Sequence, residues 1–312
     1  MLPGCPSIRL PSTYEYHATT TPSLAEGCRP SSPLYPKEDV RSSLLFLCLA
    51  LMAPSPASAR PETTWSRARQ PASGPAEAIG GYSKGCLQGA VALKRRGENY
   101  RVARPKRHRH FGHPELISVI EALAKEMKSH KLGVLYVSDL AQPQGGPSTS
   151  GHASHQSGLD ADVWYLATKR GKGRSIVDRK RETKSSRWSS RVPRMLELAA
   201  TDERVARIFV HPVIKRELCE ETKGERSWLQ KLRPWWGHDS HFHVRLHCPK
   251  NSPDCEAQAA LPKGDGCAEL EWWFDKEAQA DRKKSRKKYS DKVGAQPELP
   301  GKCQDIAARS KK

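Results

Sequence analysis

Two short stretches of this chain concentrate side chains that can bind a metal ion. The first covers residues 151–162 and contains His152, His155, Asp160 and Asp162. The second covers residues 236–244 and contains His238, His241 and His243. Imidazole nitrogens together with a carboxylate oxygen form the ligand set of a catalytic zinc ion. Because five of the 12 histidines fall in these two stretches, we predict that the stretches meet around one metal.

The first stretch is expected to form a loop followed by a strand. Serine and glycine flank its two histidines and disfavour a helix, so the pair differs from the helical H-E-x-x-H of other metallopeptidases. A strand over residues 159–166 would place Asp160, Asp162 and Trp164 on one face. Such a loop and strand bring His155 and Asp162 to one point. We interpret Asp160 as a supporting residue rather than a ligand.

The second stretch ends in a clear alternation of polar and apolar residues over 241–246. It predicts a strand with His241, His243 and Arg245 on one face and apolar side chains on the other. Three protein ligands would leave a fourth position on zinc for a water, whose pKa falls towards ~7. A neighbouring histidine can then accept the proton of that water. The spacing alone does not decide which of His241 and His243 is the ligand and which is the base.

Several other residues are given a structural interpretation. Five further histidines are treated as ordinary core or surface residues: His108, His110, His113, His211 and His247. Trp235 and Trp236 are interpreted as core or as the wall of a cleft. A serine peptidase is disfavoured, because the chain has no G-x-S-x-G, and its S-x-x-K match at residues 285–288 lies in a basic tail without partner motifs.

The charge of the chain favours an anionic partner. Its 312 residues include 53 Lys and Arg against 34 Asp and Glu, a net charge of +19. Such a balance suits nucleic acid, an acidic membrane surface or an acidic polymer without selecting among them.

An export signal is predicted near the start of the chain. Arg41 precedes an apolar run over 44–52, and Ala57-Ser58-Ala59 resembles a cleavage site. We interpret residues 41–59 as a secretory signal peptide, because the apolar run is too short to span a membrane. Residues 1–40 are then an extension upstream of the true start of translation.

The mature chain is divided by composition into three parts. Residues 60–80 are rich in Pro, Ala, Ser and Arg and are predicted to form a flexible lead-in. Residues 81–280 hold the catalytic domain, and residues 281–312 form a basic low-complexity tail. Within the domain, helices are expected at residues 113–129, 194–200 and 268–278, and strands at 133–139, 159–166, 207–210 and 241–246. A basic surface insertion is expected at residues 169–191.

The cysteines support an oxidising compartment. Removal of residues 1–59 leaves six: Cys86, Cys219, Cys248, Cys255, Cys267 and Cys303. An even number in an exported chain suggests a disulfide framework, although spacing cannot choose among the 15 possible pairings. A cysteine zinc site is disfavoured because no C-x-x-C pair is present.

Several separated motifs together resemble the penicillin-insensitive murein endopeptidases. The similarity covers about residues 81–303 and is carried by Gly85–Ala90, Phe111–Pro114, Gly151–Gln156, Gly158–Asp160 with Asp162, Arg207–Val210, His241–Leu246 with Cys248-Pro249, and Gly264–Cys267. The resemblance implies an α+β fold, with a small antiparallel sheet, flanking helices and disulfide bracing in a single catalytic domain. It implies a zinc peptidase related in core fold to the lysostaphin and D-Ala-D-Ala carboxypeptidase enzymes. Its implied activity is periplasmic cleavage of peptidoglycan cross-links between D-alanine and meso-diaminopimelate.

The resemblance also implies a role for each site residue. His155, Asp162 and His243 would be the zinc ligands, and His152 would lie at or next to the metal. His241 would take the place of the general base, and His238 would line the site. The implied disulfides join Cys86 to Cys303, Cys219 to Cys267, and Cys248 to Cys255.

The resemblance bears on the number of metal ions, and two alternative functions remain beside it. Family members can carry an Asp and a His for an additional metal after the strand of Asp162, but residues 169–191 contain no such His. We therefore predict one zinc ion. The predicted partner is peptidoglycan, and we expect neither nucleic-acid binding nor a stable membrane span. The alternatives are a zinc D-alanyl-D-alanine carboxypeptidase and a basic wall- or nucleic-acid-binding module with a closed structural metal site. The sequence makes no prediction of the oligomeric state.

Overall fold

A computed structural model describes residues 63–149, 153–168, 172–281, 283–284 and 298–309 of the chain. All of these residues belong to one compact unit, residues 56–312. The predicted upstream extension, signal peptide and most of the basic tail lie outside the described residues, as does His152.

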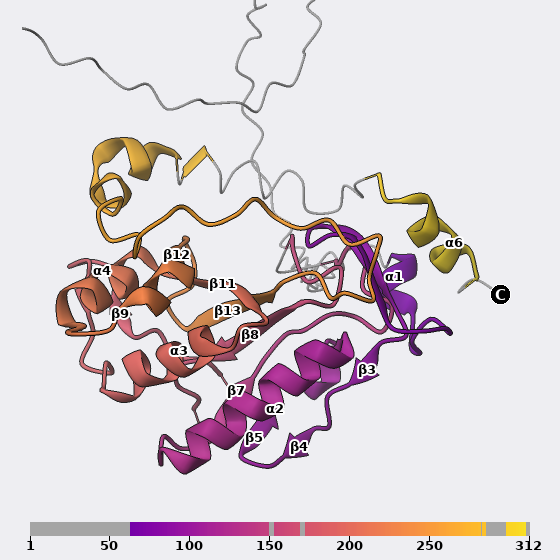
Figure 1. Ribbon diagram of the computed structural model, residues 1–312, viewed down its shortest axis with the longest axis horizontal. Helices are drawn as coiled ribbons and strands as arrows, with labels where there is room; N and C mark the ends of the chain where they lie inside the picture. Colours follow the sequence, from indigo (N-terminus) through magenta and orange to yellow (C-terminus); the bar gives the residue numbers. More distant parts are fainter. Residues whose placement is uncertain (1–62, 150–152, 169–171, 282, 285–297, 310–312) are drawn as a thin grey trace, which may run out of the picture. The chain divides into compact units, whose positions relative to one another are not determined.

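A seven-stranded sheet forms the centre of the fold (Figure 1). Its strands lie in the order β12 (Leu232–Pro234), β11 (Val205–Val210), β13 (His241–Leu246), β8 (Asp160–Trp164), β7 (Leu135–Val137), β5 (Tyr100–Val102) and β4 (Arg96–Gly97). The four predicted strands are present as β7, β8, β11 and β13, which confirms an α+β fold.

The sheet is mixed rather than purely antiparallel. β11 pairs with β12 and β5 pairs with β7 in parallel, whereas the other neighbours are antiparallel. A parallel pair needs a long crossover connection, commonly a helix. α2 (Pro114–Ser129) lies between β5 and β7 in the chain, and α4 (Pro212–Glu221) lies between β11 and β12.

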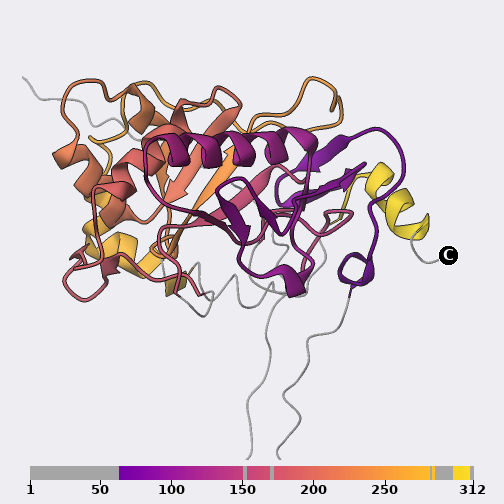
Figure 2. The same cartoon turned by 90° about the horizontal axis from the view of Figure 1, so that it is seen from below.

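One face of the sheet is covered by helices (Figure 2). The apolar stripe of α2 packs in the same core as one alternate set of strand residues, which includes Leu135, Val137, Ala161 and Val163. α3 (Arg191–Thr201) contributes to that core as well. Because side chains alternate along a strand, Asp160, Asp162 and Trp164 project from the opposite face. The sheet therefore has a packed face and a face that is available for chemistry.

Four predicted local features need correction. The described part of the lead-in contains α1 (Thr64–Arg67) and β1 (Glu77–Gly81), and Trp65 is buried. The tail contains α6 (Gly301–Arg309), which packs with α1 and β1 through Cys303 and Ile306. The helix expected at 268–278 is instead the 3-10 turn η3 (Glu271–Phe274) followed by a helix over 276–281. The sequence predicts that Pro212 ends a strand, but in the structure Pro212 also occupies the first turn of α4.

Shorter elements complete the unit. β1 pairs with β2 (Lys84–Gln88), β3 (Val91–Ala92) pairs with β6 (Phe111–Gly112), and β9 (Val177–Asp178) pairs with β10 (Thr183–Lys184). Two further 3-10 turns are η1 (Pro105–Arg107) and η2 (Ser227–Lys231). The β9–β10 hairpin lies in the predicted basic insertion, which is anchored by the fully buried Ile176.

Three disulfides brace the unit. They join Cys86 to Cys303, Cys219 to Cys267, and Cys248 to Cys255. These are the pairs that the resemblance implies. A search of the described residues finds no helix with the length and apolar character needed to cross a membrane.

Candidate metal centre

Three side chains converge on the open face of the sheet: His155, Asp162 and His243. One ligand atom from each lies within 4.8 Å of the other two. Asp162 Oδ1 lies 3.3 Å from His155 Nε2 and 3.2 Å from His243 Nδ1. The convergence follows from strand pairing, since Asp162 on β8 stands directly opposite His243 on β13.

A strained turn before β8 presents His155. This residue has a positive φ of 66°, an unusual conformation for a side chain other than glycine. Its backbone N–H donates to Asp160 Oδ2 at 2.9 Å, which ties the loop to the strand that carries Asp162. Gly158, also at positive φ, lies so close to Leu87 that a Cβ would approach its side chain to 2.3 Å. The loop therefore depends on a glycine here to bring His155 back to the strand.

Asp160 contacts two of the three converging residues, His155 at its backbone and His243 at its ring, and so fixes their positions. It is fully buried, and its Oδ1 lies 2.9 Å from His243 Nε2 and accepts from Arg245 Nε at 2.7 Å. Burial alone would raise the pKa of Asp160, but Arg245 and His243 outweigh burial and hold the pKa well below its ordinary value. A charged Asp160 can accept a proton from His243 Nε2. The neutral tautomer with this proton would leave the lone pair of His243 Nδ1 directed at Asp162.

The donor set fits a divalent metal such as zinc. Two imidazole nitrogens and one carboxylate oxygen converge from a loop and two strands, and each of the three side chains is at most 6% exposed. A ligand histidine that donates its second ring N–H to a carboxylate is the common supporting arrangement in metal sites, and the Asp160–His243 pair has this form. Among the described residues, these three side chains can therefore supply three ligands to one ion.

Two further histidines lie beside the three side chains. His241 Nε2 is 3.7 Å from Asp162 Oδ1, and the ring of His238 lies 5.0 Å from that of His241 and 5.9 Å from that of His243. Burial lowers the pKa of His241, and burial together with the neighbouring histidines lowers the pKa of His238 well below its usual value. Both imidazoles are therefore neutral near pH 7 and can accept a proton.

The loop that carries His238 is anchored on α4. The backbone N–H of His211, the N-cap of that helix, donates to the carbonyl of His238 at 3.1 Å. Phe209 packs edge-on against His243 at 5.4 Å and also contacts Trp235. Phe209 on β11 and Trp235 after β12 thus form an aromatic wall on one side of the centre.

The structure brings together most of the predicted site residues. His155, Asp162, His238, His241 and His243 lie in one group. His152 lies outside the described residues, so its position stays a prediction.

The sequence interpretation assigned no role to Arg245 or Phe209, although both side chains support the centre. The alternation in residues 241–246 places Arg245 on the same face as His241 and His243. This pattern is the sequence feature that could have identified Arg245 as part of the site. No comparable pattern singled out Phe209.

Two histidines that were given a structural interpretation cap helices. His113 Nδ1 accepts from the backbone N–H of Glu115 at the start of α2, and His211 Nδ1 accepts from that of Val213 at the start of α4. Both precede a proline in the first helical turn. A His-Pro pair in this chain is therefore a helix start.

Comparisons with known proteins agree with these motifs. The family model described as penicillin-insensitive murein endopeptidase matches residues 78–308. A penicillin-insensitive murein endopeptidase of Haemophilus influenzae is 45% identical over 225 residues, which cover 68% of this chain and 79% of the relative. Relatives of the same name from Yersinia enterocolitica and Salmonella paratyphi C are 43% and 39% identical, covering 72% and 78% of this chain and 86% and 90% of their own lengths. The chain therefore belongs to the penicillin-insensitive murein endopeptidase family.

Proposed function

We propose that this chain is a periplasmic zinc endopeptidase that hydrolyses murein cross-links at the bond between D-alanine and meso-diaminopimelate. The observation that carries the proposal is the convergence of His155, Asp162 and His243 in a chain of this family. Murein is the substrate that the names of the relatives give. The net charge of +19 suits a polymer rich in carboxylates.

His155 Nε2, Asp162 Oδ1 and His243 Nδ1 would hold one zinc ion. Zinc, when bound, would activate a water and polarise the carbonyl of the scissile bond. Asp160 fixes the tautomer of His243 through its contact with Nε2 at 2.9 Å, and Arg245 keeps Asp160 charged. His152 is proposed to lie at or beside the ion.

His241 is proposed as the general base. It lies beside Asp162, and because its pKa is lowered by burial it is neutral and able to accept a proton. It would take a proton from the attacking water and return it to the leaving amine as the C–N bond breaks. His238, whose ring lies beside both His241 and His243, would line the site and keep water and substrate ordered there.

The insensitivity to penicillin follows from this chemistry. β-Lactams acylate a serine nucleophile, and the proposed reaction uses a water instead. The three disulfides agree with a periplasmic location, because such bonds persist in oxidising compartments.

Incubation with purified muropeptide dimers tests the proposal. The wild-type chain should convert cross-linked dimers to monomers, lose this activity with a chelator and regain it with zinc. His155→Ala, Asp162→Ala and His243→Ala should each abolish turnover while the disulfide-braced fold persists. Release of terminal D-alanine without loss of dimers would indicate a carboxypeptidase. Full activity in any of the three variants would contradict the assignment.

A further inference from the structure

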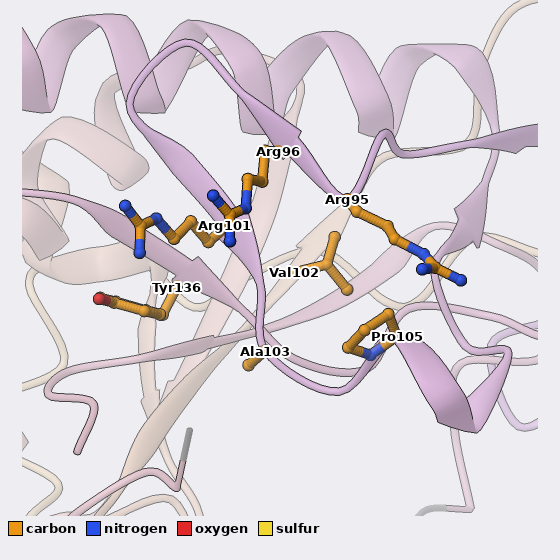
Figure 3. Close-up of a pocket in the computed structure, with 7 residues that line it drawn as sticks. All are labelled: Arg95, Arg96, Arg101, Val102, Ala103, Pro105 and Tyr136. Atoms are coloured by element: carbon orange, nitrogen blue, oxygen red, sulfur yellow. The ribbon is translucent and has the colours of Figure 1, made fainter. Parts of the chain in front are cut away.

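A basic pocket lies at the sheet edge remote from the metal centre (Figure 3). Its volume is about 410 Å³, and it is lined by Arg95, Arg96, Arg101, Val102, Pro105 and Tyr136, among others. Its lining residues lie within residues 95–105, before α2, except for Tyr136 on β7. Nothing in the proposed hydrolysis uses these residues.

The arginines of this pocket have few competing anions. Arg95, Arg96 and Arg101 are exposed, and within the described residues no ion pair joins any of them to a carboxylate. Glu98, on the turn between β4 and β5, is instead paired with Lys128 of α2 at 3.0 Å. Guanidinium groups bind carboxylates and phosphates through forked pairs of N–H donors. The guanidinium groups of Arg96 and Arg101 beside the pocket are therefore available to an anion from outside the chain.

Three lining residues of the pocket, Arg96, Arg101 and Tyr136, share one face of the sheet with the metal centre. His241 on β13 stands opposite Trp164 on β8, and Trp164 stands opposite Tyr136 on β7. Tyr136 in turn stands opposite Arg101 on β5, which stands opposite Arg96 on β4. Residues that are directly opposite in neighbouring strands project from the same face. One row of side chains therefore runs from the proposed base to the arginines.

Trp164 lies in this row between His241 and Tyr136, and other residues cover its ring. The guanidinium of Arg104 lies 5.1 Å over its ring, and Gly173 packs so closely on it that a Cβ would lie 3.1 Å from ring atoms. The ring is only 3% exposed. The guanidinium of Arg104 therefore places a positive charge over the row midway between the two sites.

The spacing fits a peptide that reaches both sites. Neighbouring strands lie about 4.8 Å apart, so Arg101 and Arg96 are roughly 14 Å and 19 Å from the strand of His241. An extended peptide advances about 3.3 Å per residue, so this span corresponds to roughly four to six residues. Murein peptides are of this size and carry free carboxylates.

We propose that Arg96, Arg101 and Tyr136 form a remote anion subsite that binds a carboxylate of the murein peptide while the scissile bond lies at the metal centre. This inference rests on the proposed function and names a further contact of the same substrate. A contact that is equally strong in the ground state and in the transition state lowers KM without raising kcat, and we assign this uniform kind of binding to the subsite. The subsite therefore acts on substrate affinity rather than on turnover.

The test compares Arg96→Gln/Arg101→Gln with the control Lys125→Gln/Arg187→Gln. The control removes the same charge from two exposed residues outside the pocket, one of them on α2 behind the sheet. The pocket variant should raise KM for muropeptide dimers roughly three- to tenfold with kcat unchanged, because it removes binding common to ground state and transition state. Its KM should also depend less on ionic strength. The control should match the wild type.

Sedimentation of metal-free protein with purified murein separates this inference from the proposed function. The pocket variant should bind native murein more weakly than the wild type does, and the two should bind equally to murein with amidated carboxylates. Turnover by the wild type with an unchanged KM in the pocket variant would overturn the subsite and leave the proposed function standing. Absence of turnover by the wild type would overturn the proposed function. Pocket-dependent binding to anionic phospholipid vesicles, but not to murein, would overturn the choice of a carboxylate.

Discussion

Asp160 and Asp162 show how neighbouring carboxylates on one strand face acquire different roles. Asp162 faces the imidazoles of His155 and His243, whereas Asp160 faces Arg245 and the opposite nitrogen of His243. The strand pattern predicts that they share a face. The strand pattern does not predict that Arg245 lies next to Asp160. That contact is set by the pairing of β8 with β13.

Asp160→Asn should weaken metal binding without removing a ligand. The neutral amide cannot form an ion pair with Arg245. It also no longer favours the tautomer of His243 that carries its proton on Nε2. Loss of such a supporting partner typically lowers metal affinity about 10- to 100-fold. Competition titration with a zinc-binding dye measures the affinity, and excess zinc should restore part of the hydrolysis.

Asp305→Asn is the matched control for this substitution, since Asp305 is an exposed carboxylate on α6. It should leave zinc affinity unchanged. Equal zinc affinity in Asp160→Asn and the wild type would contradict the supporting role of Asp160.

At the scale of elements, the periodicity of the sequence predicts the two strands that hold the site residues. The alternation in 241–246 matches β13, and the predicted strand at 159–166 contains β8. The parallel pairs β5–β7 and β11–β12 were not predicted, because strand direction depends on crossovers between distant segments. α4 was missed for a local reason, since a proline after a strand signals equally a strand end and a helix start.

His113→Ala should destabilise the fold without removing catalysis. The substitution deletes the N-cap of α2, a loss of about 1 kcal/mol in the free energy of unfolding, with a further loss from the buried ring. His113→Asn keeps a capping oxygen and should recover part of that loss. Chemical denaturation measures both variants, and turnover per folded molecule should equal that of the wild type. A loss of turnover like that of His155→Ala would assign His113 to the site.

Lys215 on α4 predicts a pH dependence of stability. Its side chain is fully buried and donates to the carbonyls of Leu229 and Asp265. Burial lowers its pKa to about 7, against 10.5 for an ordinary lysine. Between these values the unfolded chain binds more protons than the folded chain, so the contribution of Lys215 to the free energy of unfolding rises with pH.

Lys215→Met removes this dependence. The difference in unfolding free energy between the wild type and Lys215→Met should grow from about pH 7 to about pH 10, by at most ~1.4 kcal/mol per pH unit. Denaturation curves at several pH values measure it, with the exposed Lys125→Met as control. A difference that stays constant with pH would show that Lys215 keeps an ordinary pKa.

At the scale of the whole molecule, the two ends of the described unit are joined. Trp65 of α1 and Ile306 of α6 share a small apolar cluster with the Cys86–Cys303 disulfide. The sequence indicated flexible ends, because Pro, Ala, Ser and Arg dominate one end and Lys and Arg the other. A few buried residues were enough to order both ends, and composition does not reveal such long-range packing.

Removal of the long disulfide should lower stability more than removal of the short one. Cys86–Cys303 spans 217 residues and Cys248–Cys255 spans 7. In the chain-entropy model the corresponding losses are about 5 and about 2 kcal/mol. Equilibrium unfolding of Cys86→Ser/Cys303→Ser and Cys248→Ser/Cys255→Ser tests the order. A larger loss for the short loop would contradict it.

Zinc titration of metal-free protein tests the central claim most directly. Hydrolysis of muropeptide dimers is followed as zinc is added to the wild type and to Asp162→Ala. The wild type should gain activity in proportion to bound zinc and reach its maximum at one equivalent, while Asp162→Ala stays inactive. Activity in the metal-free wild type, or activity that continues to rise towards two equivalents, would contradict a single catalytic ion held by His155, Asp162 and His243.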